Sequence, residues 1–216
     1  MNIAFRRMSI GLLLVLLDIK IIYFDILPDF IGYFMMLSAL RTLGEKHAGY
    51  RKAEPFAMLL GLAALTELLP LWQTVSWNSA SELPISSLIY GCITGICQLL
   101  LLERFMFELA KHAREAGHRV LADSADSRRL WYVIASAVYM LTIPFILNAG
   151  VEFVTAAIVA GLVQFLVLLA VYFLCRKAAK SAWHSPKGGG GGHVDVRVGE
   201  SEAGVEPDGR TIDFRA

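Results

Sequence analysis

The sequence predicts an all-α integral membrane protein, a bundle of about six transmembrane helices with both chain termini in the cytoplasm. Of its 216 residues, 56% are hydrophobic and 18% are charged, and the mean hydropathy is +0.56. Six apolar segments follow one another, and the basic residues gather in alternate connections between them. Soluble domains average about a quarter charged residues. The composition therefore excludes a soluble globular domain, a disordered chain and a nucleic-acid-binding module.

The predicted spans follow from length, because a crossing helix needs about 20 mainly apolar residues. They are the ranges 8–24, 29–43, 56–75, 85–102, 130–147 and 153–175. Arg41 and Glu45 cut the second range short, so the first two segments form either two full spans or one re-entrant hairpin. The fourth helix is predicted to continue out of the membrane from Glu103 to about Arg119, since this stretch lacks Pro and consists of helix-forming residues.

Basic residues decide which connections are cytoplasmic, because Lys and Arg accumulate on that side of short loops. Of the 20 Lys and Arg residues, all except Lys20 lie before the first, or after the second, fourth or sixth span. We therefore predict a multipass protein of the cell membrane with cytoplasmic N- and C-termini. A re-entrant first hairpin would preserve the same sidedness.

The chain is predicted to have two parts. Residues 1–185 form the transmembrane helical domain, and residues 186–216 form a flexible, Gly-rich cytoplasmic tail that begins with five consecutive Gly at 188–192. Such a polar segment buries too little apolar area to offset the entropy lost on ordering.

Polar side chains fall near the middle of several predicted spans. Asp18 and Glu67 lie ten and eleven residues from the cytoplasmic ends of their spans, about 15 Å deep at helical rise. Gln164 lies at a similar depth, and Lys20 could neutralise a carboxylate. Charged groups in spans tend to face the bundle interior. This candidate intramembrane cluster would either bind a cation or relay protons, or only form interhelical hydrogen bonds, and we favour the second interpretation.

A turn motif connects the first two spans in the sequence FDILPDFIGY at residues 24–33. Pro28 suits the first turn of a helix, and the dipole at that helix start favours the negative charges of Asp25 and Asp29. Gly32 allows a neighbouring helix to approach closely. These features predict a turn with tight helix packing.

This motif, preceded by an acidic residue in the first span, resembles a group of small multipass membrane proteins of Gram-positive bacteria. The resemblance covers residues 15–43. It implies a place in the cell membrane and no particular activity.

The remaining patterns argue against catalysis. The sequence has no H-E-x-x-H, P-loop, G-x-S-x-G or C-x-x-C motif, so we predict no enzymatic activity, no cofactor and no metal. Glu108, His112 and Glu115 share one face of the predicted helix extension, which we expect to be a solvated charged face rather than a metal site. Gly91 and Gly95 form a G-x-x-x-G pattern through which the chain could form a homo-oligomer.

Two functions are compatible with these features. The first is a scaffold or assembly protein whose basic loops and tail contact anionic lipids or a membrane or cytoplasmic protein partner. The alternative is a small transporter or ion-conducting protein that uses the polar layer of Asp18 and Glu67. A water-accessible cavity that reaches Asp18 would favour the alternative.

Overall fold

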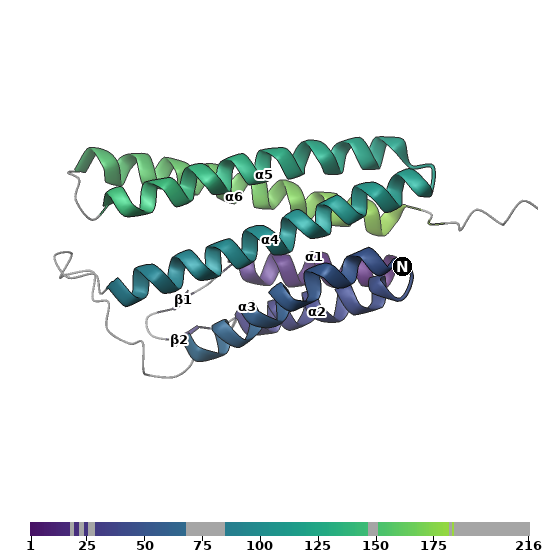
Figure 1. Cartoon of the computed structure of the whole chain (residues 1–216), viewed down its shortest axis with the longest axis horizontal. Coiled ribbons are helices and arrows are strands. Elements are labelled where there is room, and N and C mark those ends of the chain that lie inside the picture. Colours follow the sequence, from purple (N-terminus) through teal and green to yellow (C-terminus); the bar gives the residue numbers. More distant parts are fainter. Residues whose placement is uncertain are drawn as a thin grey trace, which may run out of the picture. The chain divides into compact units, whose positions relative to one another are not determined.

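The computed structural model describes residues 1–17, 20–21, 24–25, 29–67, 85–146, 151–181 and 183. In this part the chain is almost entirely helical, which confirms the prediction of an all-α protein (Figure 1). The six α-helices are α1 (Asn2–Leu17), α2 (Asp29–Gly44), α3 (Glu54–Glu67), α4 (Ile85–Glu115), α5 (Arg119–Ile146) and α6 (Val151–Lys180). A 3-10 helix, η1 (Ala48–Ala53), joins α2 to α3.

The end of the first predicted span differs from the structure. The helix α1 ends at Leu17, and two short strands, β1 (Lys20–Ile21) and β2 (Phe24–Asp25), pair in antiparallel register. A continuous helix over the predicted range 8–24 is therefore wrong at Lys20, Ile21 and Phe24, which lie in these strands. Residues 19–24 are mainly Ile, Tyr and Phe, and β-branched and aromatic side chains favour extended backbone.

Two helices extend well beyond the apolar segments that predicted them. The helix α4 continues past residue 102 to Glu115, and this confirms that the chain remains helical there. The helix α5 begins at Arg119, eleven residues before the predicted fifth span starts at residue 130. The added turns of α5 form because Leu121, Ala122 and Ala125 recur at helical spacing and are buried.

The turn between α4 and α5 depends on Gly117, which has a φ of 80°. The backbone N–H of His118 donates to the carbonyl of Ala113 at 2.7 Å, and that of Gly117 donates to Arg114 at 3.0 Å. This pattern closes a helix end where a residue adopts the left-handed conformation that suits Gly. The turn reverses the chain, so that α5 packs on α4.

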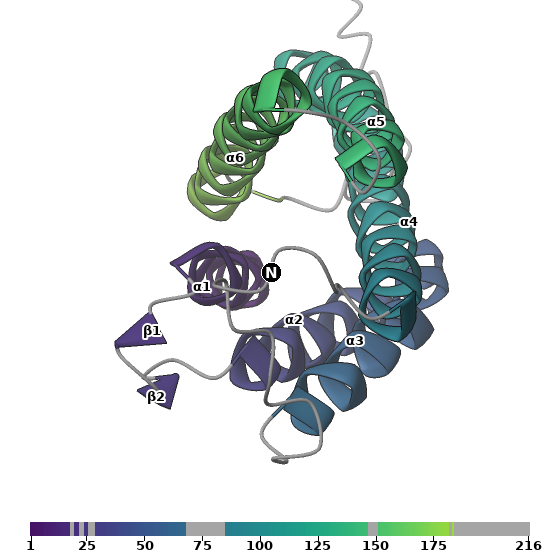
Figure 2. The same ribbon diagram turned by 90° about the vertical axis from the view of Figure 1, so that its left-hand side faces the viewer.

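Helices that follow one another in sequence pack against each other, and α1 also packs against α6 (Figure 2). In the described part, each of the six helices therefore contacts two other helices. The first and last helices of the bundle are neighbours in space although they are far apart in sequence.

The contact between α1 and α2 is especially close at two glycines. A Cβ atom on Gly32 would lie 2.7 Å from the carbonyl oxygen of Gly11, and a Cβ atom on Gly11 would lie 2.6 Å from that of Gly32. Both distances are shorter than van der Waals contact, so only glycine fits at either position. The two backbones touch here, as in helix pairs that pack through small residues.

The exposure of apolar side chains differs along the length of the helices. The completely buried apolar side chains are concentrated at one end of the bundle, where α1 begins and α4 ends, and they include Phe5, Phe105 and Leu109. We call this the charged end, since it also carries the ion pairs of the α4–α5 turn. The most apolar stretches are exposed instead, for example Leu141 and Ile158, which are both 67% exposed.

Within the described residues, one helix segment, Thr155–Lys180, is long and apolar enough to cross a membrane. Its most apolar window has a mean hydropathy of 2.6 and is 22% buried. The prediction of six spans goes beyond this finding and stays a prediction.

Candidate functional site

A cluster of ionisable and aromatic side chains lies at the charged end of the bundle. Its members come from the segment around η1, from α4 and from the residues that follow α6. We call it the His–Glu cluster, and it consists of His47, Tyr50, Lys52, Glu108, His112, Glu115 and Trp183.

Glu108 lies at the centre of this cluster and is 3% exposed. Its Oε2 is 3.7 Å from Nδ1 of His47, and its Oε1 is 3.9 Å from Nζ of Lys52. The carboxyl group lies directly against Gly49, where any side chain would overlap it. The expectation of a solvated face is therefore wrong for Glu108, because the segment around η1 folds back over α4 and covers it.

Two imidazole rings stack beside this carboxylate. The ring centroids of His47 and His112 are 5.1 Å apart with an interplanar angle of 20°. Nε2 of His47 is 3.3 Å from Oε2 of Glu115, and Nδ1 of His112 is 3.4 Å from the hydroxyl of Tyr50. Each imidazole thus contacts a different polar partner as well as the other ring.

The cluster changes the protonation of its buried members. Burial lowers the pKa of His112, and His47 lowers it further, while Glu115 acts in the opposite direction. Burial raises the pKa of Tyr50 well above its usual value, with an added contribution from Glu108. At neutral pH, Tyr50 therefore keeps its proton, and its hydroxyl can donate a hydrogen bond to Nδ1 of a neutral His112.

Trp183 joins the end of α6 to the cluster. Its ring stacks on Phe5, with centroids 5.1 Å apart, and lies 4.7 Å from the ring of His112 and 5.6 Å from that of His118. Its Nε1 donates to the carbonyl of Ala178 at 2.8 Å. The N-terminal and C-terminal helices are therefore fixed to the same set of side chains.

Stability should depend on pH through His112. The unfolded chain binds a proton at the ordinary His pKa of about 6.5, whereas the folded chain resists protonation of His112. The contribution of neutral His112 to the free energy of unfolding is therefore fully present above about pH 6.5. It is lost as the pH falls through the lower pKa of the folded chain. The titratable groups facing His112 are His47, Glu115 and Tyr50.

We expect the melting temperature in detergent to fall between about pH 7.5 and about pH 5.5, and to fall less in His112→Gln, which cannot titrate. His193→Gln, in the Gly-rich tail, serves as the control and should retain the slope of the unmodified chain. Equal slopes for His112→Gln and the unmodified chain would contradict this assignment.

Of the intramembrane cluster predicted from the sequence, the structure describes the side chain of one residue, Gln164. Nε2 of Gln164 donates to Oγ of Ser136 on α5 at 2.9 Å. Asp18 lies outside the described residues, and the structure describes only the backbone of Lys20 and Glu67. The grouping of these four side chains therefore stays a prediction.

The turn motif is also described in part. Asp29 is the first residue of α2 and lies in its first turn, where the helix dipole favours a negative charge. Gly32 lies against Gly11 of α1. Asp25 belongs to β2 and is described by its backbone, and Pro28 lies outside the described residues.

The glycines of the G-x-x-x-G pattern have different surroundings. A Cβ atom on Gly95 would lie 2.9 Å from Cε of Met140 on α5, so this glycine already serves packing within the chain. At Gly91, a Cβ atom would meet no described atom within 4 Å.

A cavity of about 390 Å³ lies between α1, α4, α5 and α6. We call it the Gln164 cavity, because Gln164 lines it and has a buried Oε1 without a hydrogen-bond partner among the described residues. Gln98 and Tyr139 supply its other polar groups, and the rest of the wall is apolar: Leu12, Val15, Leu16, Gly161, Phe165 and Leu168.

Sequence reasoning missed four members of the His–Glu cluster: His47, Tyr50, Lys52 and Trp183. One available signal was that all five His residues lie outside the predicted spans, at positions 47, 112, 118, 184 and 193. In the described part, no group of three or more His, Cys, Asp or Glu residues is arranged to hold a metal ion.

Comparison with known proteins matches the chain to no family model, to no curated protein and to no solved structure.

Proposed function

We propose that the chain is a multipass protein of the cell membrane that acts as a scaffold or interaction protein without catalytic activity. The observation that carries the membrane assignment is the exposure of large apolar side chains along the helices. Large apolar side chains such as Ile93, Leu141 and Ile158 are more than half exposed, and leaving such residues in water costs about 1.5–3 kcal/mol each. A bilayer removes this cost, because its interior is as apolar as the side chains.

The helix lengths are compatible with a membrane placement. For α1 and α2, which are shorter than α6, two arrangements in the bilayer are possible. The 30 residues of α6 extend about 45 Å, which exceeds the hydrocarbon core of about 30 Å. The 16 described residues of α1 and of α2 extend about 24 Å each. The pair would span a locally thinned bilayer or form a re-entrant hairpin that leaves the sidedness of the chain unchanged.

The topology can be tested by labelling a variant whose three Cys residues have been replaced. A Cys at Ser79 or Ala149 should react with an impermeant reagent in intact cells. A Cys at Ala48 or Val120, both exposed at the charged end, should react only after the cells are permeabilised. This result follows from the positive-inside distribution of Lys and Arg. Labelling of Ala48 in intact cells would overturn the assignment.

The charged end supports an interaction function. The His–Glu cluster binds the segment around η1, α4 and the residue after α6 to one another, which makes a fixed platform. Lys46, Arg51 and Lys111 are exposed around it. Exposed basic side chains on a fixed surface favour a partner with an acidic surface, because complementary charge guides association and selects partners.

Affinity capture from native membranes tests this function. The unmodified chain should retain a reproducible protein partner, and the triple variant Lys46→Glu, Arg51→Glu and Lys111→Glu should lose it. The matched control reverses Arg197, Arg210 and Arg215 of the tail and should keep the partner at the same change in net charge. Equal retention by the platform variant, or loss in the tail variant alone, would contradict a role of the platform.

The second candidate function, a small transporter or ion-conducting protein, is favoured by the Gln164 cavity. A buried amide oxygen without a partner is available to a ligand or a water molecule. Reconstituted vesicles should then show a solute or ion flux that is reduced in Gln164→Leu and in Glu67→Gln. The absence of flux with the unmodified chain would leave the interaction function as the better proposal.

A further inference from the structure

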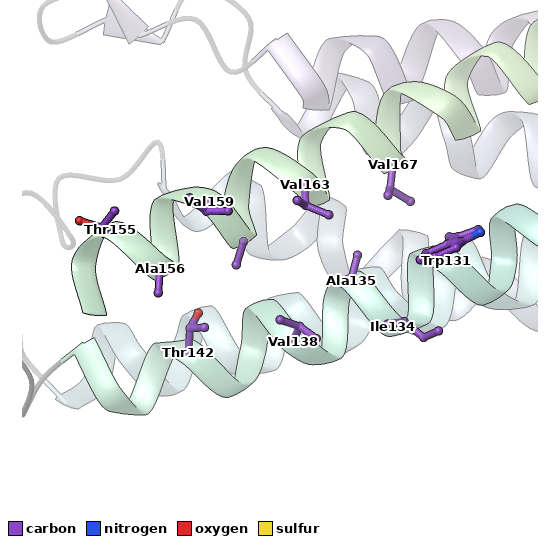
Figure 3. Close-up of a pocket in the computed structure, with 11 residues that line it drawn as sticks. Trp131, Ile134, Ala135, Val138, Thr142, Thr155, Ala156, Val159, Val163 and Val167 are labelled. Atoms are coloured by element: carbon purple, nitrogen blue, oxygen red, sulfur yellow. The ribbon is translucent and has the colours of Figure 1, made fainter. Parts of the chain in front are cut away.

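An apolar groove of about 620 Å³ runs between α5 and α6 (Figure 3). It exists because small side chains line part of it on both helices, where larger ones would fill the space. The small residues are Ala135 on α5 and Ala156 and Ala160 on α6, and the walls are formed by neighbours such as Val138 and Val163.

The groove has the length of one membrane leaflet. Trp131 and Val167 lie at one end of it, and Thr142 and Ala156 lie at the other (Figure 3). From Trp131 to Thr142 the helix rises about 16 Å, close to half of a hydrocarbon core of about 30 Å. Trp131 is 62% exposed, and Trp is enriched at the interface between the membrane and water.

The guanidinium of Arg128, which has no hydrogen-bond partner among the described residues, lies beyond the Trp131 end. Arg128 precedes Ala135 by seven residues, so both are on the same face of α5. Nη1 of Arg128 is buried and has no hydrogen-bond partner among the described residues. Cys175 of α6 is close enough for the charge of Arg128 to act on its thiol, so the guanidinium lies on the side of α5 that faces α6.

Arg129, the next residue in the chain, has the charged and aromatic partners that Arg128 lacks among the described residues. Nη1 of Arg129 is 3.8 Å from Oε1 of Glu103, its Nη2 is 3.8 Å from Oδ1 of Asp126, and its guanidinium lies over the ring of Phe107. Arg128 makes no ion pair with any carboxylate in the described part of the chain. Arg128 is half-buried with Nη1 shielded from solvent, so an anion that reaches its guanidinium would gain charge-assisted hydrogen bonds that no described residue supplies.

We propose that the groove and Arg128 together bind one anionic phospholipid from the cytoplasmic leaflet, with an acyl chain along the groove and the phosphate on Arg128. This inference rests on the proposed membrane placement. A planar guanidinium can hold a phosphate through two hydrogen bonds, and the cytoplasmic leaflet carries anionic lipids. The acyl chain is in apolar surroundings whether it is bound or free, so the charge on the headgroup determines which lipid binds.

The test uses the purified full chain in detergent and native mass spectrometry. Phosphatidylglycerol and phosphatidylcholine with identical acyl chains are added in separate titrations. The first phosphatidylglycerol should bind roughly fivefold more tightly, as expected for one basic side chain near an anionic headgroup. Equal affinity for the two lipids in the unmodified chain would overturn the proposal without the need for any variant.

Two variants then separate the charge from the groove. Arg128→Gln should abolish the preference for phosphatidylglycerol, whereas Arg129→Gln, with the same change in charge, should keep it. Ala160→Phe, which fills the groove, should weaken the first binding event for both lipids. A preference that persists in Arg128→Gln, or unchanged binding in Ala160→Phe, would refute the assigned site.

Fluorescence in vesicles distinguishes failure of the site from failure of the membrane placement. A variant in which Trp131 is the remaining Trp is reconstituted into phosphatidylcholine with a minor fraction of brominated phosphatidylglycerol or brominated phosphatidylcholine. Stronger quenching by the phosphatidylglycerol supports the proposal. Equal quenching overturns the lipid site but keeps the membrane placement, and no quenching by either lipid overturns both.

Discussion

Gly32→Val should destabilise the bundle by about 3 kcal/mol or more, the upper range for overpacking in a tightly packed interior. A Cβ atom at this position would lie 2.7 Å from the backbone oxygen of Gly11 and 2.7 Å from Cγ2 of Val15. The backbone cannot yield as a flexible side chain could, so α1 and α2 would have to separate along their contact. Thermal or denaturant unfolding in detergent measures the loss.

The matched control for this substitution is Gly91→Val on α4. A Cβ atom there would meet no described atom within 4 Å, so we expect a change within about 0.5 kcal/mol, as for substitutions away from packed features. If Gly32→Val and Gly91→Val cost the same, the close contact of α1 with α2 is not a source of stability.

Removing both of the basic side chains nearest to Glu108 should cost about 3 kcal/mol, at the lower end of the range for a buried charge that loses its partners. The variant His47→Phe with Lys52→Met leaves a carboxylate that is 3% exposed without the imidazole and the ammonium closest to it. Adding Glu108→Gln should restore part of the loss, because a neutral amide is less costly to bury than a charge.

The cycle is measured as unfolding free energy in detergent for each single, double and triple variant. Glu115→Gln is the control, since this carboxylate is 54% exposed and exposed ion pairs contribute about 1 kcal/mol or less. Strictly additive effects would show that Glu108 is not coupled to His47 and Lys52.

The sequence was sufficient for the features that depend on local composition. Continuous helix-forming residues after Glu103 predicted the extension of α4, which ends at Glu115. Similarly, the run of apolar segments predicted the helical fold. These features arise within one segment, so they are visible without knowledge of which segments meet.

The features that sequence reasoning missed depend on contacts between distant segments. Glu108 is buried because the loop around Gly49 folds over it, and no spacing rule brings residues 47 and 108 together. The early start of α5 has a similar cause, since Leu121 and Ala125 gain their burial against α4. At residues 20–21 and 24–25, in contrast, local preference for extended backbone prevailed over the apolar run that suggested a longer helix.

The contact of α1 with α6 has a consequence for the synthesis of this protein. The ribosome makes about 5–20 residues per second, so α6 follows α1 by on the order of ten seconds. During that interval α1 can pair with α2, but its other neighbour does not yet exist. In the proposed membrane placement, lipid or the insertion machinery covers that side of α1 meanwhile. A chain released before Val151 would remain an open bundle, which makes the last helix the step that completes assembly.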